Sequence, residues 1–339
     1  MMAVSPTPAT SAASAPARRL AAADFTALAQ RFIDAGFDVA QPARGIVTIK
    51  SVSGAPRASV LVSVGVHGDE TGPIEVLAEV LDALSQQPSL LAVDLMVCVG
   101  NLDAIAAGKR FIDADLNRMF RPRRGALAGA AEAARADAMI AATDTFFAAA
   151  DAGAPRWHLD LHTAIRPSLY STFAVVPELL TQERKAALID WLGQAAIGAI
   201  IMNPQSAGTY SYYSAEQHRA AAGTVELGRV GTLGQNDLSL FAQVHAALDA
   251  LLRGAAPAAA ATARPHVFKV AQEIIKLSDD FSMAFGRATH NFTALKAGAV
   301  IASDGATVYR VGPQDELVVF PNPDVRVGLR AALMVVRMA

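Results

Sequence analysis

A run of apolar and small residues that ends in a polar turn constrains the fold of this chain most. Residues 58–66, ASVLVSVGV, have the length and β-branched content of a buried strand, and the turn His67-Gly-Asp-Glu70-Thr-Gly72 breaks that strand. Pro73 then suits the first turn of a helix, and residues 74–85 have helical spacing. Such a strand–turn–helix unit is the building block of a parallel sheet covered by helices.

The same alternation of strand and helix continues along the chain. Residues 101–125 are the exception, because they are charged and without a period, so a long functional loop is predicted there. The sequence therefore predicts an α/β fold with a mixed, mainly parallel sheet and helices on both faces. Further strands are expected at 91–100, 157–162, 199–203 and 223–228, and helices at 24–37, 126–150, 179–196 and 236–253.

Changes in composition divide the chain into four parts. Residues 1–20 are rich in Ala, Ser, Pro and Thr and are expected to form a disordered tail. An α/β domain is predicted over 21–253, and the segment 254–265, GAAPAAAATARP, has the composition of a linker. After it, residues 266–339 contain short β-rich runs between Gly, Asp and Pro, which is typical of a small all-β domain.

Composition and charge exclude several classes of protein. The chain is 53% hydrophobic and 18% charged, as in globular proteins, and no apolar run reaches the roughly 18 residues of a membrane span. The net charge of −2, from 29 basic and 31 acidic residues, gives no reason to expect nucleic acid as a partner. The single cysteine, Cys98, lies in an apolar stretch and is expected to be a buried packing residue. With no targeting signal visible, a reducing, cytoplasmic location is expected.

The strongest chemical signal is the pair His67 and Glu70 at the end of the first buried strand. Ligands bind outside the carboxyl ends of strands in an open α/β sheet, and His nitrogen and carboxylate oxygen are standard zinc ligands. Catalytic zinc needs a third protein ligand, and His162, at the end of strand 157–162, is in the position to supply it. Asp160 is predicted to accept a hydrogen bond from a ligand histidine and so fix its tautomer.

Other interpretations of these residues remain open at this stage. A lone H-x-x-E pattern is weak, and His67 and Glu70 would also serve to cap the following helix. His158 shares a face of its strand with His162 and is the rival third ligand, but its position in the middle of the strand favours buried structure.

Glu226 is the candidate general base. It lies in Thr-Val-Glu-Leu-Gly, an apolar strand, and burial there would raise its proton affinity to a value that suits moving a proton from water to a leaving amine. The alternative is a structural glutamate held in a salt bridge.

Several segments in one order resemble the succinylglutamate desuccinylase/aspartoacylase family of zinc carboxypeptidase-like enzymes. The resemblance runs from about residue 55 to the C-terminus. The segments are His67-Gly-Asp-Glu70, Asn101 through Arg110 to Asp115-Leu-Asn-Arg118-Met-Phe120, Asp160-Leu-His162 and Val225-Glu226-Leu-Gly228.

The resemblance implies a role for each matching residue. One Zn²⁺ per chain would be held by His67, Glu70 and His162, and Glu226 would be the general base and acid. Arg110 would polarise the scissile carbonyl and stabilise the oxyanion, and a substrate carboxylate would be held by Asn117 and Arg118. Further tyrosine contacts are not fixed by the resemblance, although Tyr210, Tyr212 and Tyr213 lie in the region where they are expected.

Within the family, four segments are most similar to the succinylglutamate desuccinylases: Gly234-Gln-Asn-Asp237-Leu, Asn291-Phe-Thr293, Phe320-Pro-Asn-Pro323 and Gly328-Leu-Arg330-Ala. The resemblance thus implies zinc-dependent hydrolysis of N2-succinyl-L-glutamate to succinate and L-glutamate, in the succinyl route of arginine breakdown. The alternatives are an aspartoacylase-like deacylase of another N-acyl amino acid, a peptide-trimming carboxypeptidase and a non-catalytic metal- or metabolite-binding module. The expected partner is a small-molecule substrate.

Overall fold

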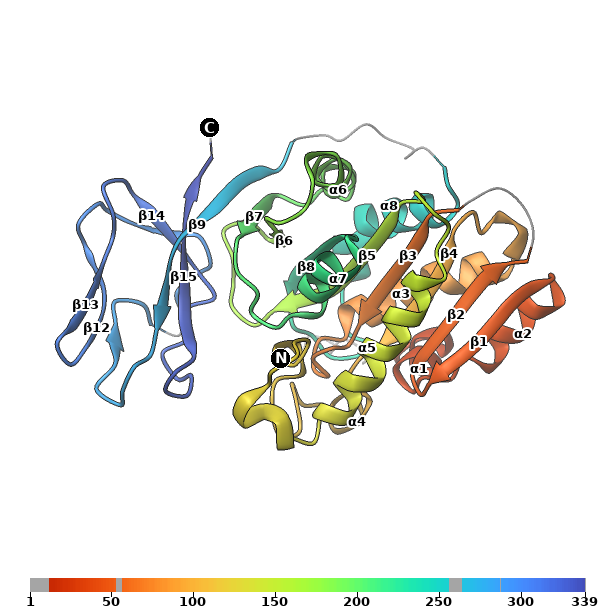
Figure 1. Ribbon diagram of the computed structural model, residues 1–339, viewed down its shortest axis with the longest axis horizontal. Coiled ribbons are helices and arrows are strands. Elements are labelled where there is room, and N and C mark those ends of the chain that lie inside the picture. Colours follow the sequence, from red (N-terminus) through yellow and green to blue (C-terminus); the bar gives the residue numbers. More distant parts are fainter. Residues whose placement is uncertain (1–11, 53–56, 256–263, 287, 339) are drawn as a thin grey trace, which may run out of the picture.

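One long mixed sheet runs through the protein. The computed structural model describes residues 12–52, 57–255, 264–286 and 288–338. Twelve strands form this sheet in the order β1-β2-β4-β3-β5-β8-β6-β7-β9-β15-β14-β11, with helices on both sides of its first two thirds (Figure 1). The α/β architecture predicted from the sequence is confirmed.

The centre of the sheet consists of four parallel strands in the order β4-β3-β5-β8. Their side chains are buried on both faces, as in the β3 sequence SVLVSV, because helices cover both sides. The carboxyl ends of parallel strands meet at one edge, so the residues that follow β3 and β5 are brought together there. These strands span Ser59–Val64 (β3), Asp94–Val99 (β4), Arg156–Ala164 (β5) and Ala221–Arg229 (β8).

Antiparallel pairs extend the central strands on both sides. On one side, β2 of the β1–β2 hairpin pairs antiparallel with β4. On the other side, β6 lies antiparallel to β8, and β7 lies parallel to β6, so both run opposite to the central strands. The sequence did not predict β1, β2 or β6. For β1 the reason is its pattern of burial, since most of its side chains are exposed and it contains a proline. The bounds are Phe37–Ala43 (β1), Ile46–Ser51 (β2), Thr172–Pro177 (β6) and Ala199–Asn203 (β7).

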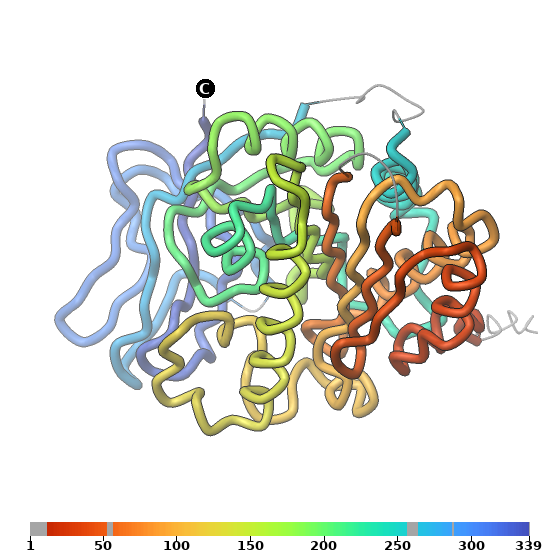
Figure 2. Tube along the Cα trace, turned by 45° about the vertical axis from the view of Figure 1, so that its right-hand side comes forward, coloured from red at the N-terminus to blue at the C-terminus, as the bar shows by residue number. Residues whose placement is uncertain are grey.

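The helices form two layers. On one face α5 and α7 pack together, and α3, α8, α6 and the N-terminal helices form the other layer. Figure 2, turned by 45°, shows α5 as a long yellow-green helix, and this helix contacts the hairpin of β1 and β2. The bounds are Thr26–Asp34 (α2), Gly72–Ser85 (α3), Leu102–Ala107 (α4), Ala133–Ala148 (α5), Gln182–Gln194 (α6), Tyr210–His218 (α7) and Ala242–Leu252 (α8).

The N-terminal segment corrects the expected tail. Helix α1 spans Ala15–Ala21, begins with Ser14 accepting a hydrogen bond from the backbone N–H of Ala17, and packs on α3. Ala17 is fully buried and Leu20 is 5% exposed, so the prediction of disorder over 1–20 was wrong for the end of that range. Its alanine-rich composition concealed two buried side chains three residues apart. Residues 1–11 lie outside the described residues.

The segment 101–125 is also more regular than the loop that was predicted. It begins with α4, capped by the Asn101 side chain, and continues through two short 3-10 helices, η2 (Leu116–Arg118) and η3 (Gly125–Gly129). Glu132 braces the stretch between α4 and η2, because its carboxylate accepts hydrogen bonds from the backbone N–H groups of residues 112, 113 and 114.

The C-terminal part is an all-β unit, as predicted, but it is not separated from the main sheet. Strand β9 pairs in parallel with β7, and β15, β14 and β11 then extend the same sheet. A second sheet of three strands, β10-β12-β13, lies beside it. The bounds are His266–Ile275 (β9), Ser282–Met283 (β10), Thr293–Leu295 (β11), Val300–Asp304 (β12), Thr307–Arg310 (β13), Glu316–Val319 (β14) and Arg330–Arg337 (β15).

Two further predictions concern the chain as a whole. Of the expected linker 254–265, residues 256–263 lie outside the described residues. Within the described ranges, every helix is too short or too polar to cross a membrane.

Candidate active site

Three buried side chains converge at the carboxyl ends of β3 and β5. The Nδ1 atom of His67 lies 2.8 Å from Oε1 of Glu70, and Nδ1 of His162 lies 2.8 Å from Oε2 of the same carboxylate. The two Nδ1 atoms are 3.2 Å apart. The structure thus brings together the three residues that the sequence predicted as metal ligands, with their candidate ligand atoms all within 4.8 Å of one another.

A close approach of two backbones fixes the turn that carries His67 and Glu70. A Cβ atom at Gly68 would lie 2.2 Å from the carbonyl carbon of Ala104 and 2.3 Å from the nitrogen of Ile105. Only glycine fits there, so the turn is pressed against α4. The polar residues after β3 are thereby held below the surface, with 4% of His67 and 2% of Glu70 exposed.

The outer nitrogens of both histidines are bound to carboxylates. Nε2 of His67 lies 2.9 Å from Oδ1 of Asp115, and Nε2 of His162 lies 3.0 Å from Oδ2 of Asp160. A ring nitrogen that donates to a carboxylate carries the proton of a neutral imidazole, so each Nδ1 presents a lone pair. Asp160 was predicted for this role, whereas Asp115 was not.

The chemistry of this donor set fits a divalent cation. Two Nδ1 lone pairs and the Glu70 carboxylate face one another at 2.8–3.2 Å, and such a set of acceptors repels itself unless a cation or a proton lies among them. Without metal, protons take this place. Burial alone would lower the pKa of His162, but the Asp160 and Glu70 carboxylates outweigh it and raise that pKa well above its usual value. Two imidazoles and one carboxylate are a donor set of catalytic zinc.

A buried hydrogen-bond chain continues behind Asp160. Ser63 donates from Oγ to Oδ1 of Asp160 at 2.5 Å, and Nε2 of His158 lies 2.8 Å from the same Oγ. The Ser63 hydroxyl has one proton, so Nε2 of His158 is the donor in that pair and its Nδ1 accepts from Ser214 at 2.8 Å. His158 is therefore a buried structural histidine bound on both sides. Burial lowers its pKa to about 4.

Glu226 lies beside the three ligand residues. It is the register partner of His162 on the neighbouring strand β8, and 7% of it is exposed. Its Oε2 atom has no hydrogen-bond partner among the described residues, which opposes the alternative of a salt-bridged structural glutamate. Burial and the negative charge of Glu70 raise the pKa of Glu226 to about 7, so this carboxylate can both take and release a proton near neutral pH.

Arg110 lies at the mouth of this cluster. Its Nη1 donates to Oε1 of Glu70 at 2.7 Å, while 29% of its side chain remains exposed. The guanidinium is therefore both oriented by the buried carboxylate and partly accessible from outside.

Asn117 and Arg118 follow on η2. The Asn117 side chain is buried, with Oδ1 accepting from the backbone N–H of Tyr210 at 2.8 Å and Nδ2 3.4 Å from Nε2 of His162. Arg118 is more open: 37% of its side chain is exposed, Nη1 donates to the carbonyl of Asn117, and Asp115 lies 4.0 Å away. Asn117 is thus held mainly by protein contacts, while Arg118 has donors to offer.

The three tyrosines left open by the sequence all use their hydroxyls within the protein. Tyr210 meets Thr143, Tyr212 donates to the carbonyl of residue 204, and Tyr213 donates to Asp144. Among the described residues, none of these three hydroxyls forms a hydrogen bond with His67, Glu70 or His162.

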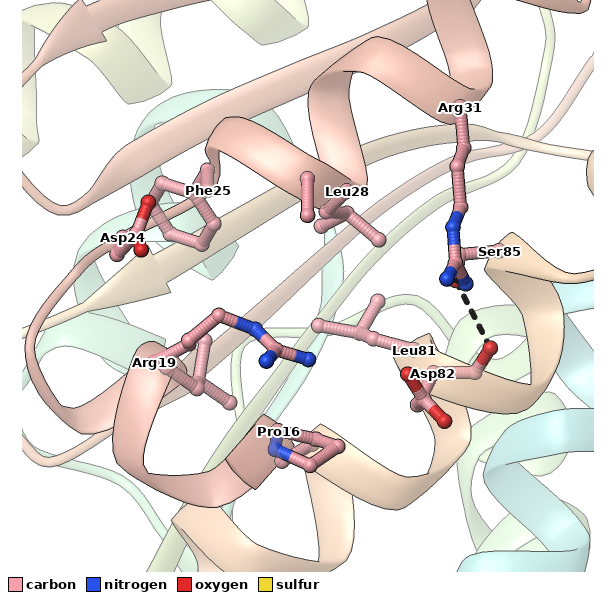
Figure 3. Close-up of a pocket in the computed structure, with 12 residues that line it drawn as sticks. Pro16, Arg19, Asp24, Phe25, Leu28, Arg31, Leu81, Asp82 and Ser85 are labelled. Atoms are coloured by element: carbon pink, nitrogen blue, oxygen red, sulfur yellow. Dashed lines mark hydrogen bonds between the residues drawn. The ribbon is translucent and has the colours of Figure 1, made fainter. Parts of the chain in front are cut away.

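A small hollow elsewhere in the protein has a lining separate from the three-ligand group. It is formed by α1, α2 and α3, and Figure 3 shows Arg31 reaching Ser85 across it, with a hydrogen bond of 2.8 Å from Nη1 to Oγ. Arg19 and Asp24 also face it, but none of its lining residues belongs to the three-ligand group.

Comparisons with known proteins agree with this geometry. Residues 56–252 match the succinylglutamate desuccinylase/aspartoacylase catalytic domain, and residues 263–338 match the AstE/AspA barrel-sandwich hybrid domain. A succinylglutamate desuccinylase of Burkholderia orbicola is 42% identical over 327 residues, covering 96% of this chain and 93% of that relative. One of Burkholderia lata is 45% identical over 280 residues, covering 83% of this chain and 79% of the relative.

Solved structures give the same result. Succinylglutamate desuccinylase from Vibrio cholerae superimposes with a TM-score of 0.83 at 33% identity, covering 90% of this chain and 88% of that chain. The enzyme from Vibrio parahaemolyticus gives a TM-score of 0.81 at 30% identity, with 92% and 95% covered. The chain therefore belongs to the succinylglutamate desuccinylase/aspartoacylase family and is a hydrolase that acts on an amide bond.

Proposed function

We propose that this protein hydrolyses N2-succinyl-L-glutamate to succinate and L-glutamate with the help of one Zn²⁺ per chain. The observation that carries the chemistry is the inward-facing donor set of His67, Glu70 and His162 beside the unpartnered Glu226 carboxylate. The substrate rests on the relatives named for this activity, which match nearly the whole chain.

The metal would be held by Nδ1 of His67, Nδ1 of His162 and the carboxylate of Glu70. When bound, zinc supplies a Lewis acid that polarises a carbonyl and makes a nearby water more acidic. Asp115 and Asp160 hold the two imidazoles in the tautomer and orientation that such binding requires.

Glu226 moves the proton of the reaction. Its unpartnered Oε2 takes a proton from the attacking water, whose oxygen forms the new C–O bond with the acyl carbon. The same oxygen then delivers that proton to the amide nitrogen as the C–N bond breaks, so succinate leaves with the water oxygen and glutamate leaves as the amine. The pKa of about 7 suits both halves of this transfer.

Arg110 and Arg118 would bind different negative charges of the substrate. Arg110, anchored on Glu70 with part of its guanidinium exposed, is placed to stabilise negative charge that develops on the scissile carbonyl oxygen. Arg118, whose side chain is 37% exposed, would hold a carboxylate that the substrate carries throughout, together with Nδ2 of Asn117.

A combined metal analysis and substrate panel tests this function. We expect about one zinc per chain and faster hydrolysis of N2-succinyl-L-glutamate than of N-acetyl-L-aspartate or N-acetyl-L-glutamate. Preference for an acetylated amino acid would move the protein to the alternative, an aspartoacylase-like deacylase, and leave the metal assignment intact. Full activity in the stringently metal-free protein would remove the metal from the proposal.

A further inference from the structure

We propose that Arg330, from the C-terminal β unit, binds a second carboxylate of the substrate opposite Arg118, and so makes this unit a part of the substrate-binding site. The ligand class is an N-acyl amino acid with carboxylates at both ends. This inference rests on the proposed function, because it names how that substrate would be selected.

The Arg330 guanidinium has hydrogen-bond donors that its contact with Glu273 leaves available. It is the first residue of β15, with 19% of its side chain exposed, and Nη1 lies 3.1 Å from Oε1 of Glu273 on the adjacent strand β9. A guanidinium has five N–H donors, and within the described part of the chain this contact is its one side-chain hydrogen bond. Both side chains of the pair are partly open to solvent, with 27% of Glu273 exposed.

The start of β15, which carries Arg330, lies next to the segment of the α/β domain that carries Arg118. Burial lowers the pKa of Arg330, and the positive charge of Arg118 lowers it further, although Glu273 opposes both. Figures 1 and 2 both show the beginning of β15 next to the yellow segment that carries η2 and η3. Glu273 and Asp115 each contact one of these guanidiniums, and the donors that remain on the two like-charged groups indicate a place for further carboxylates.

Arg118 connects this pair to the reaction centre. It follows Asn117, whose Nδ2 lies 3.4 Å from Nε2 of His162, and it precedes the buried Met119 and Phe120. A molecule with one carboxylate on Arg118 and another on Arg330 would therefore be bound next to the ligand group. Substrates with one carboxylate would leave one of the two guanidiniums unpaired.

Continuous hydrogen bonding holds Arg330 in place. It pairs in register with Ile275 on β9, and β9 is itself bonded to β7 of the α/β domain. A backbone bridge between Ser168 and Asn291 adds a second tie between the two parts. The guanidinium is thus presented by a fixed strand, so little ordering is needed when the anion binds.

Substitution at Arg330 tests the proposal, with Arg337→Ala as a matched control at the exposed, far end of the same strand. We expect Arg330→Ala to raise KM for N2-succinyl-L-glutamate about 10- to 100-fold with kcat changed less than about threefold, the range for a lost charge-assisted hydrogen bond. Arg330→Lys keeps the positive charge but lacks the bidentate guanidinium, so its KM should lie between those of wild type and Arg330→Ala. Arg337→Ala should leave KM and kcat unchanged.

Substrate analogues show which carboxylate Arg330 meets. N2-succinyl-L-glutamine lacks the side-chain carboxylate of glutamate, and N-acetyl-L-glutamate lacks the terminal carboxylate of succinate. The cost of Arg330→Ala should disappear for the analogue that lacks the matching group and persist for the other. An equal cost for both analogues would mean that Arg330 binds neither end carboxylate, and would overturn the proposal, whether the residue acts through the fold or through the α-carboxylate that both analogues keep.

Binding measurements separate this inference from the proposed activity. Titration calorimetry of wild type and Arg330→Ala with succinate and with L-glutamate reports carboxylate binding without turnover. A loss of affinity of about tenfold or more for one product supports the inference even if another acyl amino acid proves to be the better substrate. Unchanged KM and unchanged affinity for both products, with a normal melting temperature, would refute it.

Discussion

Nε2 of His67 and Oδ1 of Asp115 lie 2.9 Å apart, and this contact decides which face of the imidazole is offered to a metal. The outer nitrogen carries the proton, and the inner one is left with a lone pair beside Glu70. Asp115 also accepts from the backbone N–H of Asn117. The residue that fixes the tautomer of one ligand therefore also positions η2, the short helix that presents Arg118.

His162 and His158 should respond differently to substitution. His162→Ala removes one of three donors and is expected to lose zinc, measured by metal analysis after dialysis, while most of the fold survives. His158→Ala should keep zinc but reduce the free energy of unfolding by about 1–3 kcal/mol, because Ser63 and Ser214 would each lose a buried partner. Full zinc occupancy in His162→Ala would show that the third ligand is another residue.

Replacing Glu226 by glutamine tests the proton transfer. Glutamine is nearly isosteric and cannot take a proton, so Glu226→Gln should retain zinc and substrate binding and lose about 10²–10⁴ in kcat. The melting temperature should change little, because Oε2 has no partner among the described residues to lose. Near-normal turnover together with a much lower melting temperature would assign Glu226 to structure instead.

The raised pKa of Glu226 also has a signature in stability. Its folded pKa of about 7 lies above the ordinary value of 4.5, so the folded state binds this proton more tightly than the unfolded state does. The contribution to stability is complete below about pH 4.5 and is lost as the pH rises through 7. Metal-free wild type should therefore lose stability over this window relative to metal-free Glu226→Gln. Parallel pH curves from denaturant unfolding would contradict the raised pKa.

The same group sets the pH dependence of the reaction. A base must be unprotonated to act, so kcat/KM should fall about tenfold per pH unit on the acid side of the Glu226 pKa. A bound cation nearby lowers that pKa, and we therefore expect the acid limb of the metal-loaded enzyme to lie below 7. The limb should vanish from the residual activity of Glu226→Gln; its persistence there would assign it to another group.

Substitutions of Arg118 and of Arg110 are expected to affect KM and kcat differently. Arg118→Ala removes contact with a carboxylate present in ground and transition states, so KM should rise while kcat stays close to normal. Arg110→Ala removes stabilisation of charge that forms only during reaction, so kcat should fall. Arg110→Ala also leaves Glu70 without its 2.7 Å partner, so zinc content must be measured alongside. The opposite pattern in the two variants would reverse the assignments.

Helix α1 gives a prediction about stability alone. A chain that begins at residue 22 loses the burial of Leu20 and Ala17 against α3, which should cost about 2–4 kcal/mol of unfolding free energy. A chain that begins at residue 12 keeps the helix and serves as the control. Equal melting temperatures for the two truncations would show that the α1 contact contributes nothing.

The sequence was informative where a local pattern and a general rule coincide. An apolar strand that ends in His67-Gly-Asp-Glu70 can be recognised directly, and the rule that strand ends meet at one edge then brings in His162 and Glu226. Asp115 could not be found in this way, because it follows His67 by 48 residues and the path of the intervening chain decides whether the two meet. Arg330 is separated from these residues by an even longer stretch of sequence, so it could not be found either.

Secondary structure was missed where burial does not follow a simple period. Helix α7, Tyr210–His218, begins Tyr-Ser-Tyr-Tyr-Ser, and its buried serines give no apolar stripe. Strand β1 is largely exposed, and its side chains alternate between half-buried and exposed only over the first four residues. Composition did show that the chain changes character near residue 254, but it could not show that β9 would join β7.

That pairing has a mechanical consequence. The backbone hydrogen bonds between β7 and β9 have to break before the α/β domain and the C-terminal β unit can separate by a hinge motion. Substrate capture by hinge closure is thus disfavoured, and molecules have to enter and leave through an aperture shaped by side chains and surface loops. The two parts should also melt in one calorimetric transition, because neither can unfold without exposing the edge of the other.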